Sequence, residues 1–219
     1  MNKPRICAVI TSADASVIKQ ADQYADLYEL RLDMIGLSWP FMLPFIHKPW
    51  IATCRLKSEG GTWDASEAKR KEEILKALSQ GASMIDLELG TPNLERLAGI
   101  IKKKSKLIIS YHNYNETPSR EILAKIVEKE FKAGADIAKI ATTANCTSDA
   151  LRVLQIIQKF PGKDIVAIAM GEKGSLSRIL APLIGSPFTY ASTSRGLESA
   201  DGQFPAAELK EIYGMLGLS

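Results

Sequence analysis

The feature that most constrains the fold of this chain is a strict alternation of short apolar runs with longer segments from one end to the other. Short runs rich in Ile, Val, Leu and Ala, bounded by turn residues, are typical of buried strands, and the longer segments have the length of helices. The predicted strands cover residues 5–10, 27–32, 50–55, 83–89, 106–112, 136–141, 164–170 and 187–192. Helical segments follow them at about residues 13–24, 39–45, 65–79, 93–103, 119–133, 147–159, 175–184 and 205–216.

Local start and stop signals agree with these boundaries. Thr91-Pro92 precedes the fourth helix, where the missing proline N–H has no helical partner to lose. Gly134 and Pro161-Gly162 end the fifth and sixth helices. Eight strand–helix units predict a parallel sheet closed into a (β/α)8 TIM barrel, an α/β fold that forms a single domain over residues 1–219. The alternative, a doubly wound open sheet, predicts a glycine-rich turn after the first strand, and residues 11–14 contain no glycine.

Composition argues against several classes of function. The net charge of +3 is dispersed, and residues 102–104 form the only short basic run, so we expect no nucleic-acid binding. The chain has no signal peptide and no apolar segment of about 18 residues, which predicts a cytoplasmic protein that does not enter a membrane. Its 3 cysteines lack metal-binding spacing and are typical of a reducing compartment, and with only 2 histidines we expect no metal site.

Polar residues recur at the carboxyl ends of consecutive predicted strands. Because successive strand side chains point to opposite faces, residues two apart share a face. The polar sets on one face are Glu29 and Arg31, Thr53 and Arg55, Asp86 and Glu88, and Ser110 and His112, with Lys139 at the same level of the sixth strand. Buried parallel strands are normally apolar, and barrel enzymes keep their active sites at the carboxyl ends of the strands. The pattern therefore predicts a site for a polar ligand at that end.

Lys139 and His112 are the reactive groups of this set. Lys139 lies among Ile and Ala, and an apolar environment disfavours an ammonium ion, which makes the amine a better nucleophile. A histidine beside it is suited to move protons at neutral pH, so the pair suggests imine chemistry. The alternative is a lysine at the end of an edge strand with its amine in water, and the strand alone favours neither.

Arginines define the expected ligand. Arg31, Arg55 and Arg178 offer forked donors for a carboxylate or for hydroxyl groups. Glu29, with the acidic residues of the fourth strand, either pairs with these arginines or accepts hydrogen bonds from hydroxyl groups. A small polyhydroxylated carboxylic acid that carries a ketone fits this inventory.

Two glycine-containing turns flank the predicted site. Glu59 lies on the turn after the third strand, where it either reaches and orients His112 or is exposed to solvent. Residues 170–175 precede a helix and offer backbone N–H groups to a phosphate, although Glu172 opposes an anion there.

Together these residues make the chain resemble type I 3-dehydroquinate dehydratase over nearly its whole length. The resemblance rests on the motifs Glu29-Leu30-Arg31-Leu32-Asp33, Thr53-Cys54-Arg55, Glu59-Gly60-Gly61, Ile85-Asp86-Leu87-Glu88, Ser110-Tyr111-His112-Asn113, Ala138-Lys139-Ile140-Ala141, Met170 with Gly174, Ser177-Arg178 and Ser199-Ala200-Asp201-Gly202-Gln203. Each motif alone is weak, but their order and their positions at strand ends make the set specific.

The resemblance implies an elimination of water that needs neither cofactor nor metal. Lys139 would form an imine with the ketone of 3-dehydroquinate, His112 would carry the protons, and Glu59 would orient His112. The implied substrate contacts are Glu29, Arg31, Arg55, Met170, Arg178, Ser199, Ala200 and Gln203. Arg178 would bind the carboxylate. The products would be 3-dehydroshikimate and water, and such shikimate-pathway enzymes are typically homodimers.

Two departures from the family pattern concern the walls of the site. Ile168 stands where the family often has a methionine, and the long segment 193–198 leaves open whether Tyr190 is the family's substrate-facing aromatic residue. Two other functions remain open on the residues alone. A class I aldolase would use a strand lysine and would require a phosphate site after the seventh and eighth strands. A non-catalytic barrel would bind a small carboxylate or a partner without turning it over.

Overall fold

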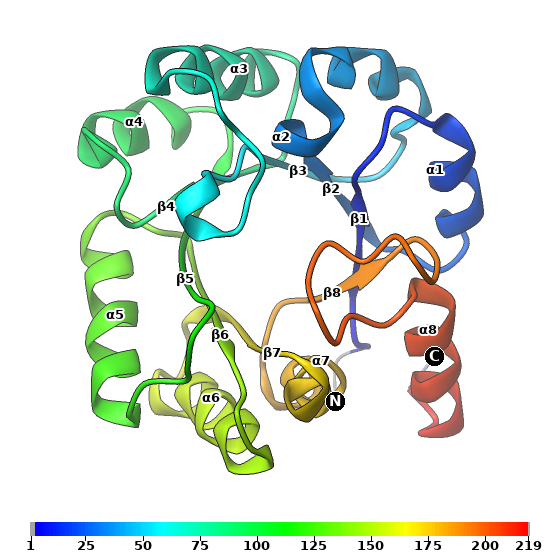
Figure 1. The fold of residues 1–219 in the computed structure, drawn as a ribbon, viewed down its shortest axis with the longest axis vertical. Coiled ribbons are helices and arrows are strands. Elements are labelled where there is room, and N and C mark those ends of the chain that lie inside the picture. Colours follow the sequence, from blue (N-terminus) through cyan, green and yellow to red (C-terminus); the bar gives the residue numbers. More distant parts are fainter. Residues whose placement is uncertain (1–2, 219) are drawn as a thin grey trace.

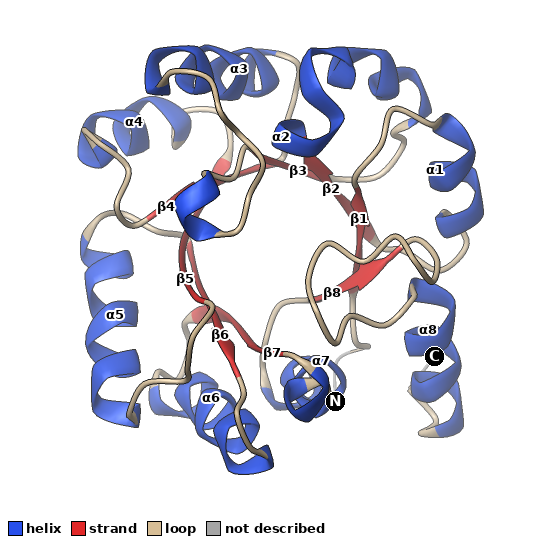
Figure 2. Ribbon diagram, viewed as in Figure 1, coloured by secondary structure: helices blue, strands red, loops and turns tan. Residues whose placement is uncertain are grey.

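The structure, a computed structural model, describes residues 3–218 and forms a ring of parallel strands inside a ring of helices (Figures 1 and 2). Adjacent strands pair in the order β7-β6-β5-β4-β3-β2-β1-β8. The strands are β1 (Ile6–Ile10), β2 (Leu27–Arg31), β3 (Trp50–Thr53), β4 (Met84–Glu88), β5 (Lys106–Asn113), β6 (Ile137–Thr143), β7 (Asp164–Met170) and β8 (Thr189–Ser192). All of the predicted strands are present, and the predicted α/β TIM barrel is confirmed.

Helices connect successive strands and cover the outside of the barrel (Figure 1). The α-helices are α1 (Ala15–Ala21), α2 (Leu32–Ile35), α3 (Glu67–Ser79), α4 (Leu94–Ile101), α5 (Arg120–Lys132), α6 (Thr147–Lys159), α7 (Leu176–Leu180) and α8 (Ala206–Met215). Short 3-10 helices are η1 (Gly36–Phe45), η2 (Lys57–Glu59), η3 (Glu172–Gly174) and η4 (Ala181–Ile184). None of the described helices is long and apolar enough to span a membrane.

Side-chain caps explain where several helices begin. Asp14, Ser66 and Ser119 each accept a hydrogen bond from a backbone N–H in the first turn of the helix that follows. The connection expected at residues 39–45 is part of η1, which contains Pro40 and Pro44. Prolines remove backbone donors, so this segment forms tight 3-10 turns instead of a regular helix.

The apolar core has two parts, one between strands and helices and one inside the barrel. Cys7, Ile51, Ile108 and Val166 belong to the inner cluster, and all are at most 1% exposed. These residues fill the barrel below the polar carboxyl ends of the strands. The packed interior therefore forms a floor, and the polar site lies above it.

The strand ladder is open between β7 and β8, for which no pairing is found within residues 3–218. Helix α7 packs against both strands at this opening. Ser177 of α7 bonds to the free edge of β7, because its hydroxyl accepts from the N–H of Ala169 at 2.9 Å. The barrel is thus closed on this side by a helix.

Candidate active site

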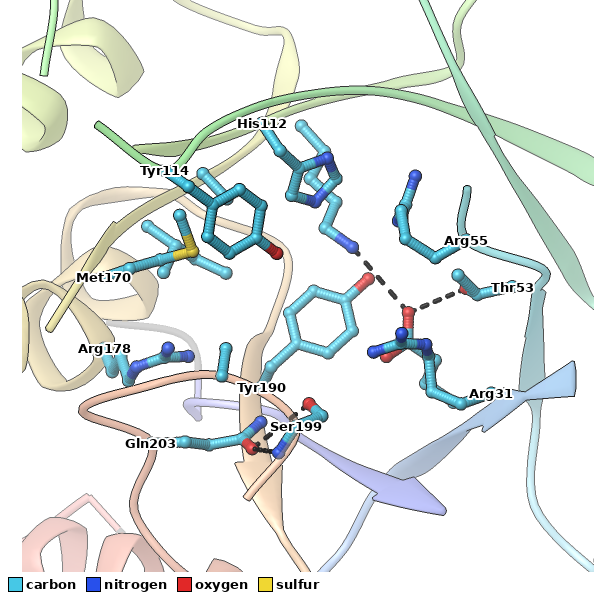
Figure 3. Close-up of a pocket in the computed structure, with 15 residues that line it drawn as sticks. Arg31, Thr53, Arg55, His112, Tyr114, Met170, Arg178, Tyr190, Ser199 and Gln203 are labelled. Atoms are coloured by element: carbon cyan, nitrogen blue, oxygen red, sulfur yellow. Dashed lines mark hydrogen bonds and ion pairs between the residues drawn. The ribbon is translucent and has the colours of Figure 1, made fainter. Parts of the chain in front are cut away.

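A pocket opens at the carboxyl ends of the strands and encloses about 470 Å³, part of it continuous with solvent. It brings together the predicted residues Glu29, Arg31, Arg55, His112, Lys139, Met170, Arg178, Ser199, Ala200 and Gln203. Glu59 does not line the pocket but hydrogen-bonds to His112. In Figure 3, Arg31 and Arg178 lie on opposite sides of the pocket.

The environment of the Lys139 amine is polar, which corrects the expectation of an apolar one. Lys139 is 5% exposed, so it is not an edge residue with its amine in water. Its Nζ lies 2.8 Å from Asp86 Oδ2 and 3.7 Å from Glu29 Oε1. The strand neighbours are apolar, but the amine extends beyond them between two carboxylates. This arrangement favours the ammonium, so a proton must leave Nζ before the amine can act as a nucleophile.

Asp86 connects Lys139 to Arg55. The Asp86 Oδ2 atom also lies 2.8 Å from Arg55 Nη2, and Oδ1 accepts a 2.6 Å hydrogen bond from Ser110. Burial by itself would raise the pKa of Asp86, but the charges of Arg55 and then Lys139 hold that pKa well below its usual range. Asp86 is therefore a permanent anion under the amine.

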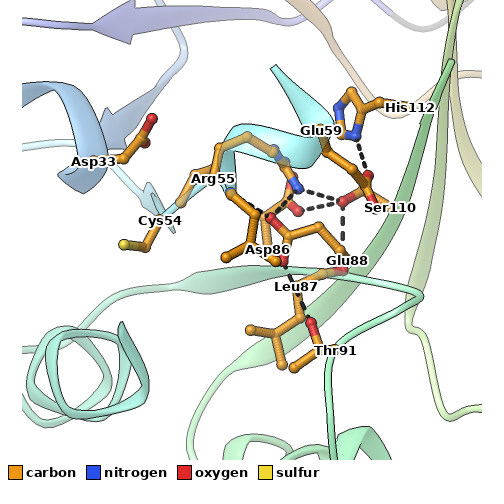
Figure 4. A network of polar contacts seen from close by, with 12 residues as sticks. Asp33, Cys54, Arg55, Glu59, Asp86, Leu87, Glu88, Thr91, Ser110 and His112 are labelled. Carbon is orange, nitrogen blue, oxygen red and sulfur yellow. Dashed lines mark hydrogen bonds and ion pairs between the residues drawn. The ribbon is translucent and has the colours of Figure 1, made fainter. Parts of the chain in front are cut away.

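A second buried network lies on the other side of Arg55 (Figure 4). Arg55 Nη1 lies 3.0 Å from Glu88, whose other oxygen lies 2.7 Å from Arg70 Nη1. Arg70 comes from α3 and is 0% exposed, and it also donates to the carbonyl oxygen of Cys54. Three elements are thereby joined behind the pocket, and Arg55 is fixed from two sides.

His112 and Glu59 form a hydrogen-bonded pair at the pocket edge. The Nδ1 atom of His112 lies 2.8 Å from Glu59 Oε2, and the histidine side chain is 7% exposed. Burial, followed by the positive charges of Arg55 and Lys139, holds the pKa of His112 well below its usual range. Burial also raises the pKa of Glu59 to about 7, although Arg55 opposes this shift. The imidazole is therefore neutral, and its Nε2 atom is free of the Glu59 contact.

Glu29 and Arg31 form the wall opposite Arg178. Glu29 Oε1 accepts a 2.7 Å hydrogen bond from Thr53. Arg31 makes a bidentate pair with Asp33, with distances of 2.9 and 2.7 Å. Both side chains are thus held by neighbours and line the pocket with fixed donors and acceptors.

Arg178 is a buried guanidinium without an acidic partner. It is 1% exposed, its Nη2 donates to the carbonyl oxygen of Asp201 at 3.2 Å, and its Nε has no hydrogen-bond partner within residues 3–218. Burial lowers the pKa of Arg178 to about 10, so it remains a cation at neutral pH. A buried cation that faces a pocket and lacks a protein counter-ion provides a site for an anionic group of a ligand.

The loop between β8 and α8 covers the pocket. Ser199 and Gln203 are joined because the Ser199 N–H donates to Gln203 Oε1 at 2.9 Å. The loop is tied to the end of β7, since the Gly171 N–H donates to the carbonyl oxygen of Asp201 at 3.1 Å. The φ of Gly202 is +73°, and a Cβ there would lie 2.4 Å from the Gly171 carbonyl oxygen. Only a glycine allows this approach without displacement.

The turn at 170–175 does not form a phosphate cradle. The N–H groups of Gly171, Gly174 and Ser175 donate to protein carbonyl oxygens. Backbone groups that are already bonded are not available to an anion, so the weak phosphate signal of the sequence is not supported.

Several lining residues were not identified from the sequence. Tyr114 lines the pocket, and its ring stacks on His112 with centroids 6.4 Å apart and planes at 17°. Thr53 also lines it, through Glu29. Tyr190, whose position was left open, lies in the pocket with its ring centroid 4.3 Å from Lys139 Nζ. Strand parity could have suggested Thr53 and Tyr190, whereas Tyr114 follows the strand and carries no such signal.

Comparison with known sequences gives a consistent result. A family model described as type I 3-dehydroquinase matches residues 6–219. A 3-dehydroquinate dehydratase of Dehalococcoides mccartyi strain BAV1 is 44% identical over 213 residues, covering 97% of this chain and 96% of the relative. The 3-dehydroquinate dehydratase of Methanocaldococcus jannaschii is 42% identical over 217 residues, covering 96% and 97%.

Solved structures are similar over the same extent. The 3-dehydroquinate dehydratase of Aquifex aeolicus VF5 has a TM-score of 0.82 at 32% identity, covering 96% of this chain and 98% of that one. The structure from Geobacillus kaustophilus HTA426 has a TM-score of 0.89 at 24% identity, with coverages of 98% and 91%. At that identity the second likeness concerns the fold alone.

Proposed function

This chain belongs to the type I 3-dehydroquinase family, and from that premise we propose that it removes water from 3-dehydroquinate through an imine on Lys139. It is a 3-dehydroquinate dehydratase, a hydro-lyase, as are its relatives by name. The observation that carries the mechanism is the convergence of a buried lysine, a neutral histidine and an unpaired arginine in one pocket. The product is 3-dehydroshikimate, which assigns the enzyme to the shikimate pathway.

The substrate carboxylate binds Arg178. The lack of an acidic partner for this buried guanidinium within residues 3–218 supports the assignment, because a carboxylate would supply the missing charge and two acceptor oxygens. The ring hydroxyl groups then face Glu29, Arg31 and Arg55 on the other side. Met170 forms an apolar wall, and Ser199, Ala200 and Gln203 of the covering loop exclude water.

Imine formation begins when Lys139 loses a proton and attacks the ketone carbon C3. The C3–N bond forms, the carbonyl electron pair moves to oxygen, and that oxygen leaves as water after taking up two protons. Asp86 and Glu29 stabilise the positive charge of the protonated imine that results. The imine withdraws electrons from the ring and acidifies the adjacent C2–H bond.

Elimination follows through His112. Its neutral imidazole takes a proton from C2, the C1–oxygen bond breaks, and the hydroxyl leaves as water with a proton returned by the imidazolium. Glu59 holds Nδ1, which directs Nε2 to the substrate. Water then hydrolyses the imine and releases the product from Lys139. No cofactor is needed, because Lys139 supplies the electron sink.

Three wider features belong to the same proposal. Residues 1–219 act as one catalytic barrel domain, two copies associate as a homodimer, and the enzyme works in the cytoplasm. The family resemblance supports the dimer. The absence of a described membrane-spanning helix is consistent with the cytoplasmic assignment.

The mechanism predicts a reducible covalent adduct on one lysine. Borohydride reduction in the presence of 3-dehydroquinate, followed by peptide mass spectrometry, is expected to mark Lys139, and Lys139→Ala to remove the mark. His112→Ala is expected to keep the adduct but to lose turnover by about 10²–10⁴-fold, because imine formation needs the amine whereas elimination needs the base. Lys106→Met, at the opposite end of β5, is the matched control and should behave as the wild type.

Either of two results would contradict this mechanism. Turnover without any adduct on Lys139 would exclude the imine, and an unimpaired His112→Ala enzyme would exclude the histidine as base. Cleavage of a sugar phosphate by protein that is inert towards dehydroquinate would favour an aldolase instead.

A further inference from the structure

Tyr190 carries a buried hydroxyl group that the fold does not use. The residue is 3% exposed, and its hydroxyl oxygen has no hydrogen-bond partner within residues 3–218. The other buried tyrosines are satisfied, since Tyr28 bonds to Asp22 at 2.6 Å and Tyr213 to the carbonyl oxygen of Ile179 at 3.1 Å. An unpaired buried hydroxyl costs folding free energy that a phenylalanine would not. The group therefore points to a partner that is not part of the protein.

The ring of Tyr190 is held rigidly in the middle of the pocket. It comes from β8 and packs edge-on against Phe188, with centroids 5.4 Å apart and planes at 80°. Figure 3 shows the ring between the covering loop with Ser199 and the strand that carries Thr53, with its hydroxyl directed away from the loop. The hydroxyl is thus presented at a fixed position, at the depth of the Lys139 amine.

The contacts of Lys139 distinguish the role of this hydroxyl. Two of the groups against Nζ are carboxylates, Asp86 at 2.8 Å and Glu29 at 3.7 Å, and the third is the Tyr190 ring with its centroid at 4.3 Å. When the amine attacks a ketone, negative charge develops on the ketone oxygen within a few ångströms of Nζ. Carboxylates cannot donate a hydrogen bond to that oxygen, but a tyrosine hydroxyl can.

We propose that the Tyr190 hydroxyl donates a hydrogen bond to the ketone oxygen of the substrate while Lys139 attacks C3. The inference rests on the imine mechanism proposed above. The nitrogen lone pair forms the C3–N bond, the carbonyl π electrons move to oxygen, and the proton that this oxygen gains replaces the one that the nitrogen loses. Tyr190 keeps its own proton throughout. It acts as a fixed donor for developing charge, as oxyanion-hole groups do.

The ionisation of Tyr190 is consistent with a donor that stays protonated. Burial, followed by the charges of Glu29, Cys7 and Asp86, raises the pKa of Tyr190 well above its ordinary value. The hydroxyl therefore remains neutral over the range in which the enzyme is assayed. The site also selects against ligands whose C3 lacks an oxygen, because they leave the hydroxyl unpaired.

The test measures how fast the imine forms at saturating substrate. Enzyme and 3-dehydroquinate are mixed, quenched with borohydride at set times, and the fraction of protein with the added mass is determined. Tyr190→Phe is expected to form the adduct about 10–100-fold more slowly than the wild type, as loss of one charge-stabilising donor does. Tyr28→Phe, a buried tyrosine on the helix side of β2, should form it at the wild-type rate.

Thermal unfolding of the free proteins separates this role from a structural one. Tyr190→Phe should unfold at or above the wild-type temperature, because it removes an unpaired hydroxyl, whereas Tyr28→Phe should unfold below it. Wild-type kinetics of adduct formation in Tyr190→Phe, or a lowered unfolding temperature, overturns the assignment of Tyr190 alone. If the wild type turns over without any adduct, the imine mechanism fails and this inference fails with it.

Discussion

One hydrogen bond of 2.8 Å, between Glu59 and His112, sets the proton chemistry of the pocket. When Glu59 is ionised it accepts from Nδ1–H, which leaves the Nε2 lone pair free to take a proton. When Glu59 is protonated it donates to Nδ1, and the imidazole proton moves to Nε2. The histidine is neutral in both cases, yet it is a base towards the pocket only in the first.

This pair predicts an acid limb in the pH profile. Because the pKa of Glu59 is raised to about 7, kcat/KM is expected to fall as the pH decreases through about 7. In Glu59→Gln the limb should move to lower pH, since the pKa of His112 lies well below its usual range, and activity should drop by about 10²-fold. Initial rates of product absorbance from pH 5 to 9 at constant ionic strength provide the measurement. An unchanged limb in the variant would assign it to another group.

Glu130 is a second acid whose charge the fold disfavours. It lies on α5, is 0% exposed, and neither carboxyl oxygen has a partner within residues 3–218. Burial, followed by the negative charges of Asp86 and Glu59, raises the pKa of Glu130 well above its usual value. The folded protein therefore keeps a proton there that the unfolded chain releases above about pH 4.3.

Stability should decrease with rising pH because of Glu130. Below the unfolded pKa both states hold the proton, and the protonated group contributes fully; above it, each pH unit costs roughly 1.4 kcal/mol until the folded pKa is reached. Glu130→Gln is expected to gain stability relative to the wild type between pH 5.5 and 8.5, by about 1–3 kcal/mol. Denaturant unfolding at both pH values measures this difference. Glu128→Gln, exposed on the same helix, is the control, and an equal pH dependence in wild type and Glu130→Gln would refute the assignment.

Among the elements, the loop between β8 and α8 depends on how closely it approaches the end of β7. Its contacts there are backbone contacts, the Gly171 N–H to Asp201 and the close passage of Gly202. The same carbonyl of Asp201 also accepts from Arg178 at 3.2 Å. The position of the loop and the position of the guanidinium are therefore linked.

Gly202→Ala should open this loop. A Cβ at Gly202 would lie 2.4 Å from a backbone oxygen, so the loop must move, and Ser199 and Gln203 with it. KM is expected to rise by about 10–100-fold, since misplaced binding groups weaken substrate positioning. Gly196→Ala is a matched control, because φ is +82° there but no atom lies within 4 Å of the added Cβ. Steady-state kinetics of both variants decide the matter, and equal KM values would show that the close approach is unimportant.

At the scale of the whole molecule, the alternation of strands and helices was enough to predict the barrel. The parity rule then placed Lys139, His112 and Arg31 at one end, because in parallel strands both the face and the level of a side chain follow from its position. The rule does not say which side chains touch across the barrel. For this reason the carboxylates against Lys139 were not foreseen, and neither was the stacking of Tyr114 on His112.

Arg70 shows a different limit. In the sequence it belongs to the charged face of α3, together with Glu67, Lys69, Glu72 and Glu73. In the structure Arg70 is fully buried and Glu73 nearly so, since one pairs with Glu88 and the other accepts from Trp39. A charged residue on a helix reads as solvent-facing unless its partner on another element is known, and that partner is distant in sequence.

The open ladder between β7 and β8 shows how cohesion and access are divided in this barrel. A ninth-neighbour strand pairing there would have completed the ring but kept every helix at the outer layer. Instead, Ser177 takes the place of a partner strand for Ala169, and the next residue, Arg178, enters the pocket from the helix. The break in the ring thus works as a doorway through which an outer-layer side chain reaches the centre. A perfectly symmetric barrel would have no such entrance, so the asymmetry of the frame is what allows the site to be charged from outside.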